Sequence, residues 1–566
     1  MSGISVFVGE PLRRASRQDC PSESVPAKAG RVIKVFSYGV WGDNVMTYDF
    51  AIIGGGHNGL VAGTFLAKAG RNVIVLEKED VVGGAVKTRE LTLPGFKHDQ
   101  FSAFHPLFVM SPVYEELKED LSKNEVKYFT FSRCFASIFP DGDSVLCYSD
   151  LGKTLCSLEK HSKADADAWN DLYSQYLKIK APMLSMMYSP FSAFSMIKAG
   201  LKFCRALGRQ EFMRFLRQVM MSPRDFADYF FKSEKAKAWI VPWAFHPDYG
   251  PDVSAGSMFA LLTAGAQQEL GLSAPEGGGG MLTLALSKVI ESQGGEVITD
   301  AHVTKITVKD GKAVGVELID GSKIEAKRGV IASLEPRQLF FELVGEEHLN
   351  GEFLALAKGY RYGVGGMKID LALDSPVEWI AGEEVGKTGF LHVGPYVNDI
   401  ARAYHEAICG LLPSDPFIFF GNHTVLDPRR APEGKHTGWI LVRGVPSEIK
   451  GDAAGKIGST DWDDVKKYYA DRVIDKVTEY APNFKDIIIG MHIQSPVDFE
   501  RNDLNLVGGD MVSGSHHLDQ NYMFRPFPGF SKYKTPIKNL YMTGASTYPG
   551  GGMNGASGYI VAKLLC

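Results

Sequence analysis

A glycine-rich turn after a short apolar run most constrains what this chain can fold into. Residues 51–53 are apolar, as expected of a buried parallel strand, and Gly54, Gly56 and Gly59 follow with the spacing G-x-G-x-x-G. The first glycine permits a tight turn, the second lets a pyrophosphate approach the backbone, and the third lets a helix pack against the strand. The spacing predicts a dinucleotide-binding turn, with phosphates at the positive end of the helix.

The residues after this turn complete the same unit. Leu60, Phe65 and Leu66 give the predicted helix an apolar face, and residues 72–76 form a second apolar run that ends in Glu77. A carboxylate at this strand end can accept hydrogen bonds from ribose hydroxyls. A lone glycine fingerprint is weak evidence, but strand, turn, helix, strand and terminal acid together predict a Rossmann-type domain.

The composition is that of a globular protein with ample material for a core. The 566 residues are 45% apolar and 22% charged, and 61 Lys and Arg against 66 Asp and Glu give a net charge of -5. No long basic patch stands out, so nucleic-acid binding is not expected. The 7 cysteines are scattered and form no C-x-x-C pair. This argues against a disulfide reductase and against a metal site.

Residues 1–45 differ in character from the rest of the chain. They mix Pro, Ser and Arg and contain no apolar segment long enough for a secretory signal. We expect a disordered leader, or a natural start at Met46 directly before the first strand. The expected location is the cytoplasm, or the mitochondrion if the leader is a genuine transit peptide, although its acidic residues argue against that interpretation.

A helical, methionine-rich region at residues 151–270 is expected to form a cap. Within it, residues 181–197 carry no charge and have basic flanks, but Pro190 interrupts them and they are too short to span a bilayer. An apolar stretch with basic flanks is typical of peripheral membrane contact, here at residues 181–205. A buried cap helix that lines an apolar cavity would produce the same pattern, so both alternatives stay open.

Later glycine-containing segments are predicted to belong to the same domain as the first glycine turn. The Asp-Gly pairs at 310–311 and 320–321 separate alternating runs and predict hairpins. Residues 329–333 have the apolar pattern of another parallel strand. A strand at 540–542 then leads into a glycine-dense turn at 544–552, which lets a flat ring system lie against backbone.

These separated segments agree, and residues 47–566 resemble the FAD-dependent phytoene desaturase superfamily. Within it, the chain resembles in particular the bacterial carotene ketolase branch and the related animal pyridine nucleotide-disulfide oxidoreductase domain-containing protein 2. Five motifs carry this resemblance. In chain order they are IIGGGHNGLVAG (52–63), LEKEDVVGGA (76–85), VLDPRRAPEGKHTGWI (425–440), ADRVIDKVTEYAPNFKDIIIG (470–490) and TPIKNLYMTGASTYPGGGMNGASG (535–558).

The resemblance implies an α/β fold with an interrupted Rossmann-type FAD-binding domain and a mixed α+β substrate domain with a helical cap. Residues 46–150, 271–334 and 496–566 would form the FAD-binding domain. Residues 151–270 would form the cap and 335–495 the substrate domain.

The resemblance also implies which residues hold FAD. The pyrophosphate would lie at the first glycine turn, the ribose at Glu77 and the adenine at the backbone of Val303, with the flavin beside Ala85 and the C-terminal turn. The expected cofactor-binding residues are Gly54, Gly56, His57, Asn58, Gly59, Glu77, Lys78, Gly83, Gly84, Ala85, Val303, Gly544, Ala545, Gly552, Met553 and Asn554. Ala85 stands where many relatives have arginine, and Tyr548 where desaturases often have histidine. Both departures bear on the reaction type more than on the cofactor.

Flavin N5 would carry the chemistry, and no catalytic residue is assigned. Trp243, His246, Asp519 and Arg525 are weak candidates, since a solitary His or Arg more often satisfies a local hydrogen bond. A second dinucleotide domain is not expected, because the glycines at 363–366 precede a strand instead of following one. Reoxidation is therefore expected from oxygen, a quinone or another acceptor.

Two functions follow from the resemblance. The first is an FAD-dependent oxidoreductase that acts on an apolar polyene, isoprenoid or lipid-like substrate. The alternative is a flavoprotein of the animal type, which acts mainly through a protein partner in respiratory metabolism. Within the enzyme class, an amine or small-alicycle oxidase on the same scaffold is a further alternative.

Overall fold

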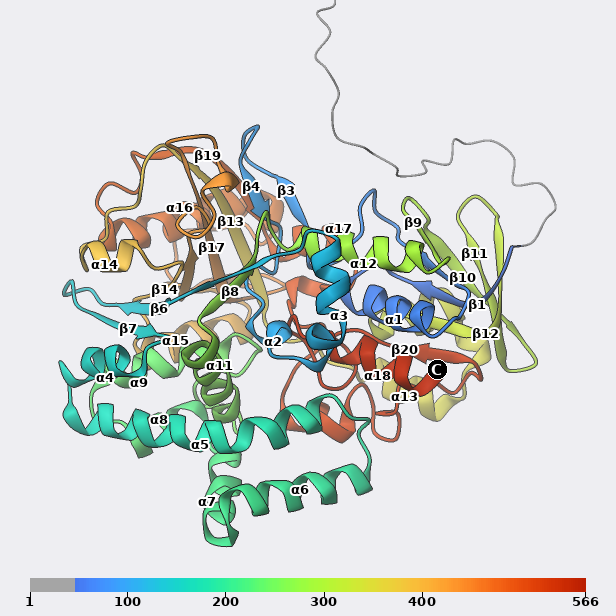
Figure 1. Ribbon diagram of the computed structural model, residues 1–566. Coiled ribbons are helices and arrows are strands. Elements are labelled where there is room, and N and C mark those ends of the chain that lie inside the picture. Colours follow the sequence, from blue (N-terminus) through green and yellow to red (C-terminus); the bar gives the residue numbers. More distant parts are fainter. Residues whose placement is uncertain (1–45) are drawn as a thin grey trace, which may run out of the picture. The chain divides into compact units, whose positions relative to one another are not determined.

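The computed structural model describes residues 46–566, so the leader at residues 1–45 lies outside the described residues (Figure 1). Two 7-stranded sheets organise the described part of the chain, with smaller two-stranded ladders beside them. Between residues 46 and 566, no helix is both long and apolar enough to cross a membrane.

The first sheet contains the predicted dinucleotide-binding unit. β1 (Met46–Ile53) pairs in parallel with β2 (Val73–Leu76) on one side and β12 (Lys323–Ala332) on the other. β2 pairs with β9 (Glu296–Ile298), and the end of β12 pairs with β20 (Leu540–Met542). The predicted parallel strand at 329–333 is confirmed as the end of the longer β12.

Two antiparallel hairpins extend this sheet. β10 (Val303–Lys309) pairs with β11 (Lys312–Leu318), and β11 pairs with the start of β12. Asp310 and Gly311 have φ angles of 50° and 69°, as a two-residue type I′ turn requires. The hairpins that the Asp-Gly pairs predict are therefore confirmed.

Side chains of β1 alternate between two cores. Phe50 and Ile52 pack with α1 (His57–Lys68), α12 (Gly280–Ser292) and α18 (Ala556–Leu565) on one face of the sheet. Ala51 and Ile53 pack on the other face with the π-helix η1 (Gln338–Val344) and α13 (Gly351–Lys358). Burial on both faces explains why this strand is continuously apolar.

The second sheet is mainly antiparallel. Its order is β19 (Ile488–Gln494), β13 (Gly365–Leu373), β17 (His436–Val445), β16 (Ile418–Gly421), β14 (Phe390–Val393), β6 (Arg133–Ile138) and β7 (Ser144–Tyr148). The sequence places residues 133–148 with the FAD-binding domain, but β6 pairs in parallel with β14 in the second sheet. That pairing joins residues far apart in the chain, and no local pattern of β6 reveals it.

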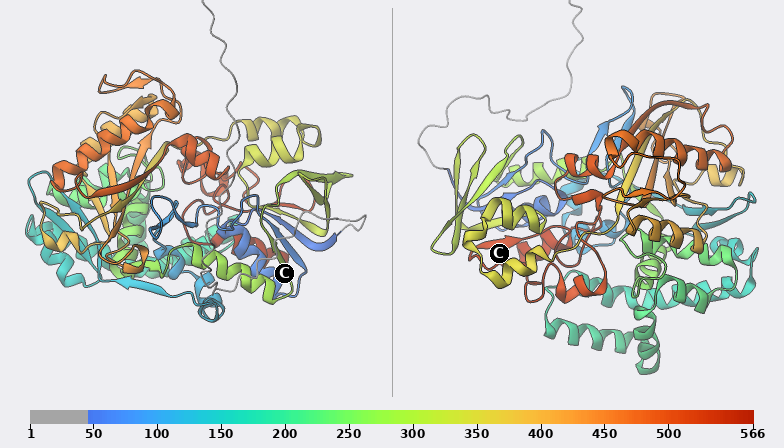
Figure 2. Two further views of the ribbon diagram at one scale, coloured as in Figure 1. Left: turned by 90° about the horizontal axis from the view of Figure 1, so that it is seen from above. Right: turned by 180° about the vertical axis from the view of Figure 1, so that it is seen from behind.

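One face of the second sheet packs against α16 (Trp462–Tyr480). The view from above shows this helix, in orange, lying along the sheet (Figure 2). Met367, Ile369 and Leu371 of β13 point into that core. Side chains alternate along a strand, so Lys368 and Asp370 lie on the opposite face.

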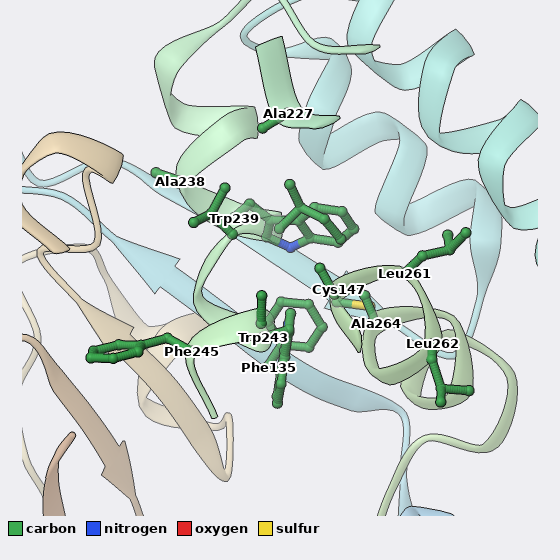
Figure 3. Close-up of a cluster of buried hydrophobic side chains, with 14 of the residues drawn as sticks. Phe135, Cys147, Ala227, Ala238, Trp239, Trp243, Phe245, Leu261, Leu262 and Ala264 are labelled. Atoms are coloured by element: carbon green, nitrogen blue, oxygen red, sulfur yellow. The ribbon is translucent and has the colours of Figure 1, made fainter. Parts of the chain in front are cut away.

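The opposite face carries the helical cap. Its helices are α4 (Leu151–Glu159), α5 (Lys163–Met187), α6 (Ala193–Leu207), α7 (Arg209–Met220), α8 (Pro223–Phe230), α9 (Glu234–Ile240), α10 (Pro242–Phe245) and α11 (Ser257–Leu270). Aromatic packing joins cap and sheet: the ring of Phe135 on β6 stacks on Trp239 with centroids 5.3 Å apart and meets Trp243 edge-on at 4.7 Å (Figure 3).

Shorter elements connect these parts. They are α2 (Pro106–Val109), α3 (Pro112–Lys123), α14 (Glu383–Gly386), α15 (Val397–Ile408), α17 (Pro496–Asn502), β3 (Thr88–Glu90), β4 (Lys97–Asp99), β5 (Tyr128–Phe131), β8 (Leu272–Pro275), β15 (Leu411–Leu412), β18 (Gly451–Asp452) and the 3-10 turns η2 (Glu346–His348), η3 (Pro428–Arg430), η4 (Val507–Gly509), η5 (Leu518–Gln520) and η6 (Tyr522–Phe524).

Candidate active site

A cavity of about 510 Å³ runs between the two sheets. Its cofactor half is lined from the first sheet and its turns, including Gly54, Gly56, His57, Glu77, Lys87, Val303, Glu342 and Asp503. Its aromatic half is lined from the cap and the second sheet by Phe104, Trp243, His246, Phe259, Thr263, Gln267, Leu272, Lys368, Phe390, Trp439 and Leu441. Residues of the C-terminal glycine turn, among them Gly544, Ala545 and Gly552, line it as well.

The first glycine turn has the geometry that its spacing predicts. Gly54 has a φ of 92°, which favours glycine. A Cβ on Gly59 would lie 2.1 Å from the Gly54 carbonyl oxygen, so any side chain there would push α1 off the strand. A Cβ on Gly56 would meet no atom closer than 3.9 Å, because this position faces the cavity.

The N-terminus of α1 is free to bind an anion. No side chain caps it, and its first turn contains no acidic residue. Its unpaired N–H groups and dipole therefore favour a phosphate at this end. His57 on this turn is half-buried, and burial lowers its pKa to about 4, so the ring is neutral. Its Nε2 lies 3.0 Å from Asn58 Nδ2.

Glu77 is held at the end of β2 by backbone donors. Its Oε2 accepts from Gly55 N at 2.8 Å and its Oε1 from Glu79 N at 3.0 Å. Burial raises its pKa, while these two bonds and the charge of Lys87 oppose that rise. The carboxylate lines the cavity, where it can accept from ribose hydroxyls.

Lys87 is a cation that the sequence does not single out. Its side chain is 3% exposed and lines the cofactor half. Burial raises the pKa of Asp503, and the charge of Lys87 opposes that rise. Lys87 and Ala85 both line the cavity. Because Thr88, Arg89 and Glu90 follow it, Lys87 has no local pattern that marks it as buried.

The C-terminal glycine turn is fixed by neighbouring side chains. Gly551 N donates to His516 Nε2 at 3.1 Å, and a Cβ on Gly550 would lie 2.4 Å from the same nitrogen. Arg525 is fully buried and donates to several carbonyls, including that of Ala545 at 2.7 Å. Arg525 thus holds this turn from behind and does not line the cavity.

Aromatic rings form a box in the other half of the cavity. The centroid of Phe390 lies 5.3 Å from Trp243, 5.8 Å from Trp439 and 5.7 Å from Phe104. His246 stacks near the same ring, and burial lowers its pKa to about 4, so it is neutral at physiological pH. The box is therefore apolar apart from a few fixed polar groups.

Lys368 places a buried cation at the edge of this box. Its ammonium pairs with Asp370 and donates to the Asp99 carbonyl oxygen at 2.9 Å, and it lies 5.9 Å from the Trp439 ring centroid. Burial disfavours ionisation of Asp99, but Arg430 at 3.0 Å and further partners lower the pKa of this carboxyl overall. The sequence does not single out Lys368, although a Lys and an Asp two residues apart in an apolar strand indicate one shared face.

Most of the expected cofactor-binding residues line this cavity. Those that do are Gly54, Gly56, His57, Asn58, Glu77, Lys78, Gly84, Ala85, Val303, Gly544, Ala545, Gly552 and Met553. Gly59, Gly83 and Asn554 lie behind it: Gly59 permits helix packing, Gly83 N donates to Gly55 O at 2.9 Å, and Asn554 Oδ1 accepts from Ala556 N at 2.8 Å.

The weak catalytic candidates divide into two pairs. Trp243 and His246 line the aromatic half. Asp519 is exposed and pairs with Arg361 at 2.6 Å, and Arg525 holds backbone carbonyls, so neither reaches the cavity. Tyr548 does not line the cavity either, and its hydroxyl donates to the Met186 carbonyl at 3.0 Å in the cap. Asp519, Arg525 and Tyr548 are therefore not among the residues that line the cavity.

A Rossmann-type turn joined to a second sheet by one cavity defines a flavin-dependent oxidoreductase. The chain belongs to the flavin containing amine oxidoreductase family, whose model matches residues 59–565. The resemblance to the phytoene desaturase superfamily is confirmed within it. The protein is an FAD-dependent oxidoreductase.

Curated relatives match along nearly their whole length. The chain is 30% identical to the mouse (Mus musculus) pyridine nucleotide-disulfide oxidoreductase domain-containing protein 2, covering 92% of this chain and 93% of the relative. It is 27% identical to a limonene dehydrogenase polypeptide of Castellaniella defragrans, covering 91% and 94%. It is 25% identical to the neurosporene-forming phytoene desaturase of Cereibacter sphaeroides, covering 91% and 93%.

A solved structure supports the fold. An oxidoreductase from Methanosarcina mazei superposes with a TM-score of 0.56 at 17% identity, covering 92% of this chain and 99% of that chain. At this identity the likeness concerns the fold alone. It agrees with the predicted α/β FAD-binding fold with a second, substrate domain.

The cofactor half fits FAD. An uncapped helix end faces the cavity for phosphates, Glu77 offers acceptors for a ribose, and glycines on two turns leave the backbone bare beside the space. A side chain at Gly56 would fill that space instead.

Proposed function

We propose that this protein oxidises an apolar, unsaturated substrate of the isoprenoid or polyene class. The observation that carries the proposal is the aromatic half of the cavity, where Phe104, Trp243, Phe390 and Trp439 surround the space. Ligand sites with this lining bury hydrocarbon and use a few polar groups for orientation. Flat rings pack well against conjugated or unsaturated carbon chains.

The distribution of charge favours a hydrocarbon over a cationic amine. The acidic residues that line the cavity, Glu77, Glu79, Glu342 and Asp503, belong to the cofactor half. Among the described residues that line the aromatic half, none carries a carboxylate, while Lys368 contributes a positive charge. A buried ammonium group needs a paired counter-ion, so this half suits an uncharged substrate.

The relatives support the same substrate class. The limonene dehydrogenase polypeptide and a phytoene desaturase, two relatives that match over nine-tenths of this chain, are named after isoprenoid hydrocarbons. The family model is named for amine oxidation. The absence of carboxylates from the described aromatic half is what distinguishes the two classes here.

Residues of the cofactor half would bind FAD, and residues of the aromatic half would orient the substrate. Gly54, Gly56 and the α1 N-terminus would hold the FAD phosphates, and Glu77 its ribose. When bound, FAD accepts a hydride equivalent from the substrate. The aromatic side chains would orient the reacting carbon atoms and exclude water, and neutral His246 would neither attract nor repel a charge.

The test is anaerobic reduction of the purified yellow protein by two matched panels of compounds. One panel holds cyclic and acyclic isoprenoid hydrocarbons and carotenoids in mixed micelles, and the other holds primary and secondary amines of similar size. We expect the flavin absorbance to bleach with members of the first panel. Bleaching by amines, together with no response to any hydrocarbon, would overturn the substrate class but leave the cofactor assignment intact.

Action through a protein partner is the second candidate. Its support is the 30% identity to the mouse relative over 92% of this chain. Co-purification of a stoichiometric partner that survives Gly56→Trp, a substitution expected to block FAD, would favour it over the enzymatic proposal.

A further inference from the structure

Helices α6 and α7 lie at one edge of the cap, beyond α5 (Figures 1 and 2). Their inner faces are packed: Phe203 of α6 stacks on Phe215 of α7 with centroids 5.4 Å apart, and both side chains are buried. α6 rests on α5, and α7 also contacts α11. The two helices are therefore an integral part of the cap and not a loose appendage.

Their outer faces expose large apolar side chains. On α6, Phe194, Ile197 and Leu201 are 76%, 64% and 68% exposed. Their spacing of three and four residues puts them in one stripe along the helix. On α7, Met213, Leu216 and Met220 repeat the same spacing and are also exposed.

Basic side chains flank both stripes. Between residues 193 and 220 the chain has six Lys and Arg and a single acid, Glu211, which pairs with Arg214. The basic residues are Lys198, Lys202, Arg205, Arg209, Arg214 and Arg217. The whole chain has a net charge of -5, so this concentration of positive charge is local.

We propose that α6 and α7 dock the protein onto an anionic phospholipid surface. The apolar stripes would enter the boundary between headgroups and acyl chains, and the basic residues would meet anionic headgroups. Long basic side chains suit this position because their stems cover apolar surface while their charged ends reach the headgroups. The excess of positive charge on this surface, six Lys and Arg against one acid, favours an anionic lipid surface as its occupant.

The exposed apolar surface on α6 and α7 coincides only in part with the membrane-contact segment that the sequence predicts at 181–205. Much of the uncharged stretch before α6 is inside the protein, since Pro182, Met183, Tyr188 and Phe191 are buried. The exposed apolar residues begin at Phe194 and continue through α7, beyond the expected 181–205. These buried residues do not line the cavity, and membrane contact through the exposed residues stays a proposal.

The proposed docking surface on α6 and α7 is connected to the cavity through α11. α7 contacts α11, and Phe259, Thr263 and Gln267 of α11 line the aromatic half. Docking would hold this wall close to the bilayer, where apolar compounds concentrate. The docking proposal itself stands independently of the proposed reaction, because it concerns lipid binding alone.

The test is co-sedimentation of the full-length, FAD-loaded protein with unilamellar vesicles of phosphatidylcholine, with and without phosphatidylserine. We expect at least about tenfold stronger partitioning onto the vesicles that contain phosphatidylserine, falling as salt increases. The triple variant Phe194→Ser/Ile197→Ser/Leu201→Ser should lose at least about tenfold in binding to these vesicles. Lys198→Gln/Arg205→Gln/Arg209→Gln should abolish the preference for phosphatidylserine.

Matched controls come from an exposed turn elsewhere. Ile319, between β11 and β12, is 68% exposed, so Ile319→Ser removes a similar apolar side chain from another surface. Lys305→Gln/Lys312→Gln/Lys323→Gln removes three exposed cations. Both controls should bind as the parent does, and flavin absorbance with circular dichroism verifies folding of every variant.

Two results would overturn the proposal. One is failure of the parent to bind either vesicle, or equal binding by the parent and both α6–α7 variants. The other is concentration-dependent dimerisation in the absence of lipid that the Phe194→Ser/Ile197→Ser/Leu201→Ser variant loses, since the surface would then be an interface between two copies of this chain.

Discussion

Lys368 and Asp370 form an ion pair on the cavity side of β13, with side-chain exposures of 3% and 0%. Burial raises the pKa of Asp370, and the Lys368 charge opposes that rise. The Lys368 charge therefore stabilises the Asp370 carboxylate in a place where water cannot.

This pairing predicts non-additive substitutions. Lys368→Met and Asp370→Leu should each destabilise the protein by about 3 kcal/mol, because each leaves one buried charge unpaired. The double variant should cost less than the two single variants together, with a coupling of about 1–3 kcal/mol. Chemical unfolding of the FAD-saturated protein measures this cycle. The exposed pair Lys358 and Glu346 is the control and should show no measurable coupling; additivity at Lys368 and Asp370 would contradict the prediction.

Gly56 and Gly59 should respond differently to substitution. Gly56→Val has room for its Cβ, so it should fold but lose at least about a hundredfold in FAD affinity by occupying the phosphate space. Gly59→Ala should fail to fold stably, because its Cβ would lie 2.1 Å from a backbone oxygen. Titration of apoprotein with FAD, beside circular dichroism, separates the two outcomes. Gly351→Ala, where no atom lies within 4 Å, is the control for both.

Lys87 should contribute to cofactor binding through its charge. Lys87→Met should weaken FAD binding by about tenfold, the scale of one charge-assisted contact, and should make the affinity less dependent on salt. Lys87→Arg keeps the charge and should retain most of the affinity. Fluorescence titration at two ionic strengths measures both quantities. Equal affinities for the Met and Arg variants would show that Lys87 acts by packing alone.

Phe104 offers a way to alter the aromatic half without disturbing the cofactor half. Its ring is partly exposed to the cavity and contacts Phe390 and Trp439. Phe104→Asn should lower the rate of flavin reduction by an isoprenoid substrate at least about tenfold, because one apolar wall is lost. FAD affinity should stay within about twofold of the parent. An unchanged reduction rate would place the substrate elsewhere.

His105 predicts a pH dependence of stability. Burial lowers its pKa from 6.5 to about 4, so the unfolded chain binds a proton first as the pH falls. Stability from this group is complete above pH 6.5 and is lost as the pH falls towards about 4. Replacement by glutamine should flatten the slope of unfolding free energy by about 1.4 kcal/mol per pH unit in that window.

The His105 prediction is tested by the difference between the variant and the parent in the slope of unfolding free energy against pH. Asp248, whose pKa burial raises to about 6, acts with the opposite sign, so the total slope is not diagnostic. Unfolding of parent and His105→Gln at several pH values provides the comparison. The exposed His405→Gln is the control and should leave the slope unchanged; an identical slope for His105→Gln would contradict the prediction.

Local patterns predicted the nucleotide-binding part of the fold in detail. The glycine spacing at Gly54, Gly56 and Gly59, the acid at Glu77 and the Asp-Gly turns each encode a backbone requirement that neighbours in the sequence satisfy. These are short-range constraints, and the sequence states them directly.

The aromatic half could not be predicted in the same way. Phe104, Trp243, Phe390 and Trp439 come from four segments that meet only because β6, β14 and β17 share one sheet with the cap above it. Asp519 and Arg525 were candidates from the sequence, but in the structure Asp519 pairs with Arg361 and Arg525 donates to backbone carbonyls, and neither lines the cavity.

The sequence by itself determined the parallel unit around β1, because glycine spacing and apolar runs act over a few residues, and the resemblance of its motifs to a known superfamily indicated the cofactor and the family. Tertiary structure alone decided that β6 and β7 join the second sheet, that Lys87 and Lys368 face the cavity, and that the exposed apolar surface lies on α6 and α7. Those outcomes depend on pairing and burial between distant segments, which no local pattern specifies.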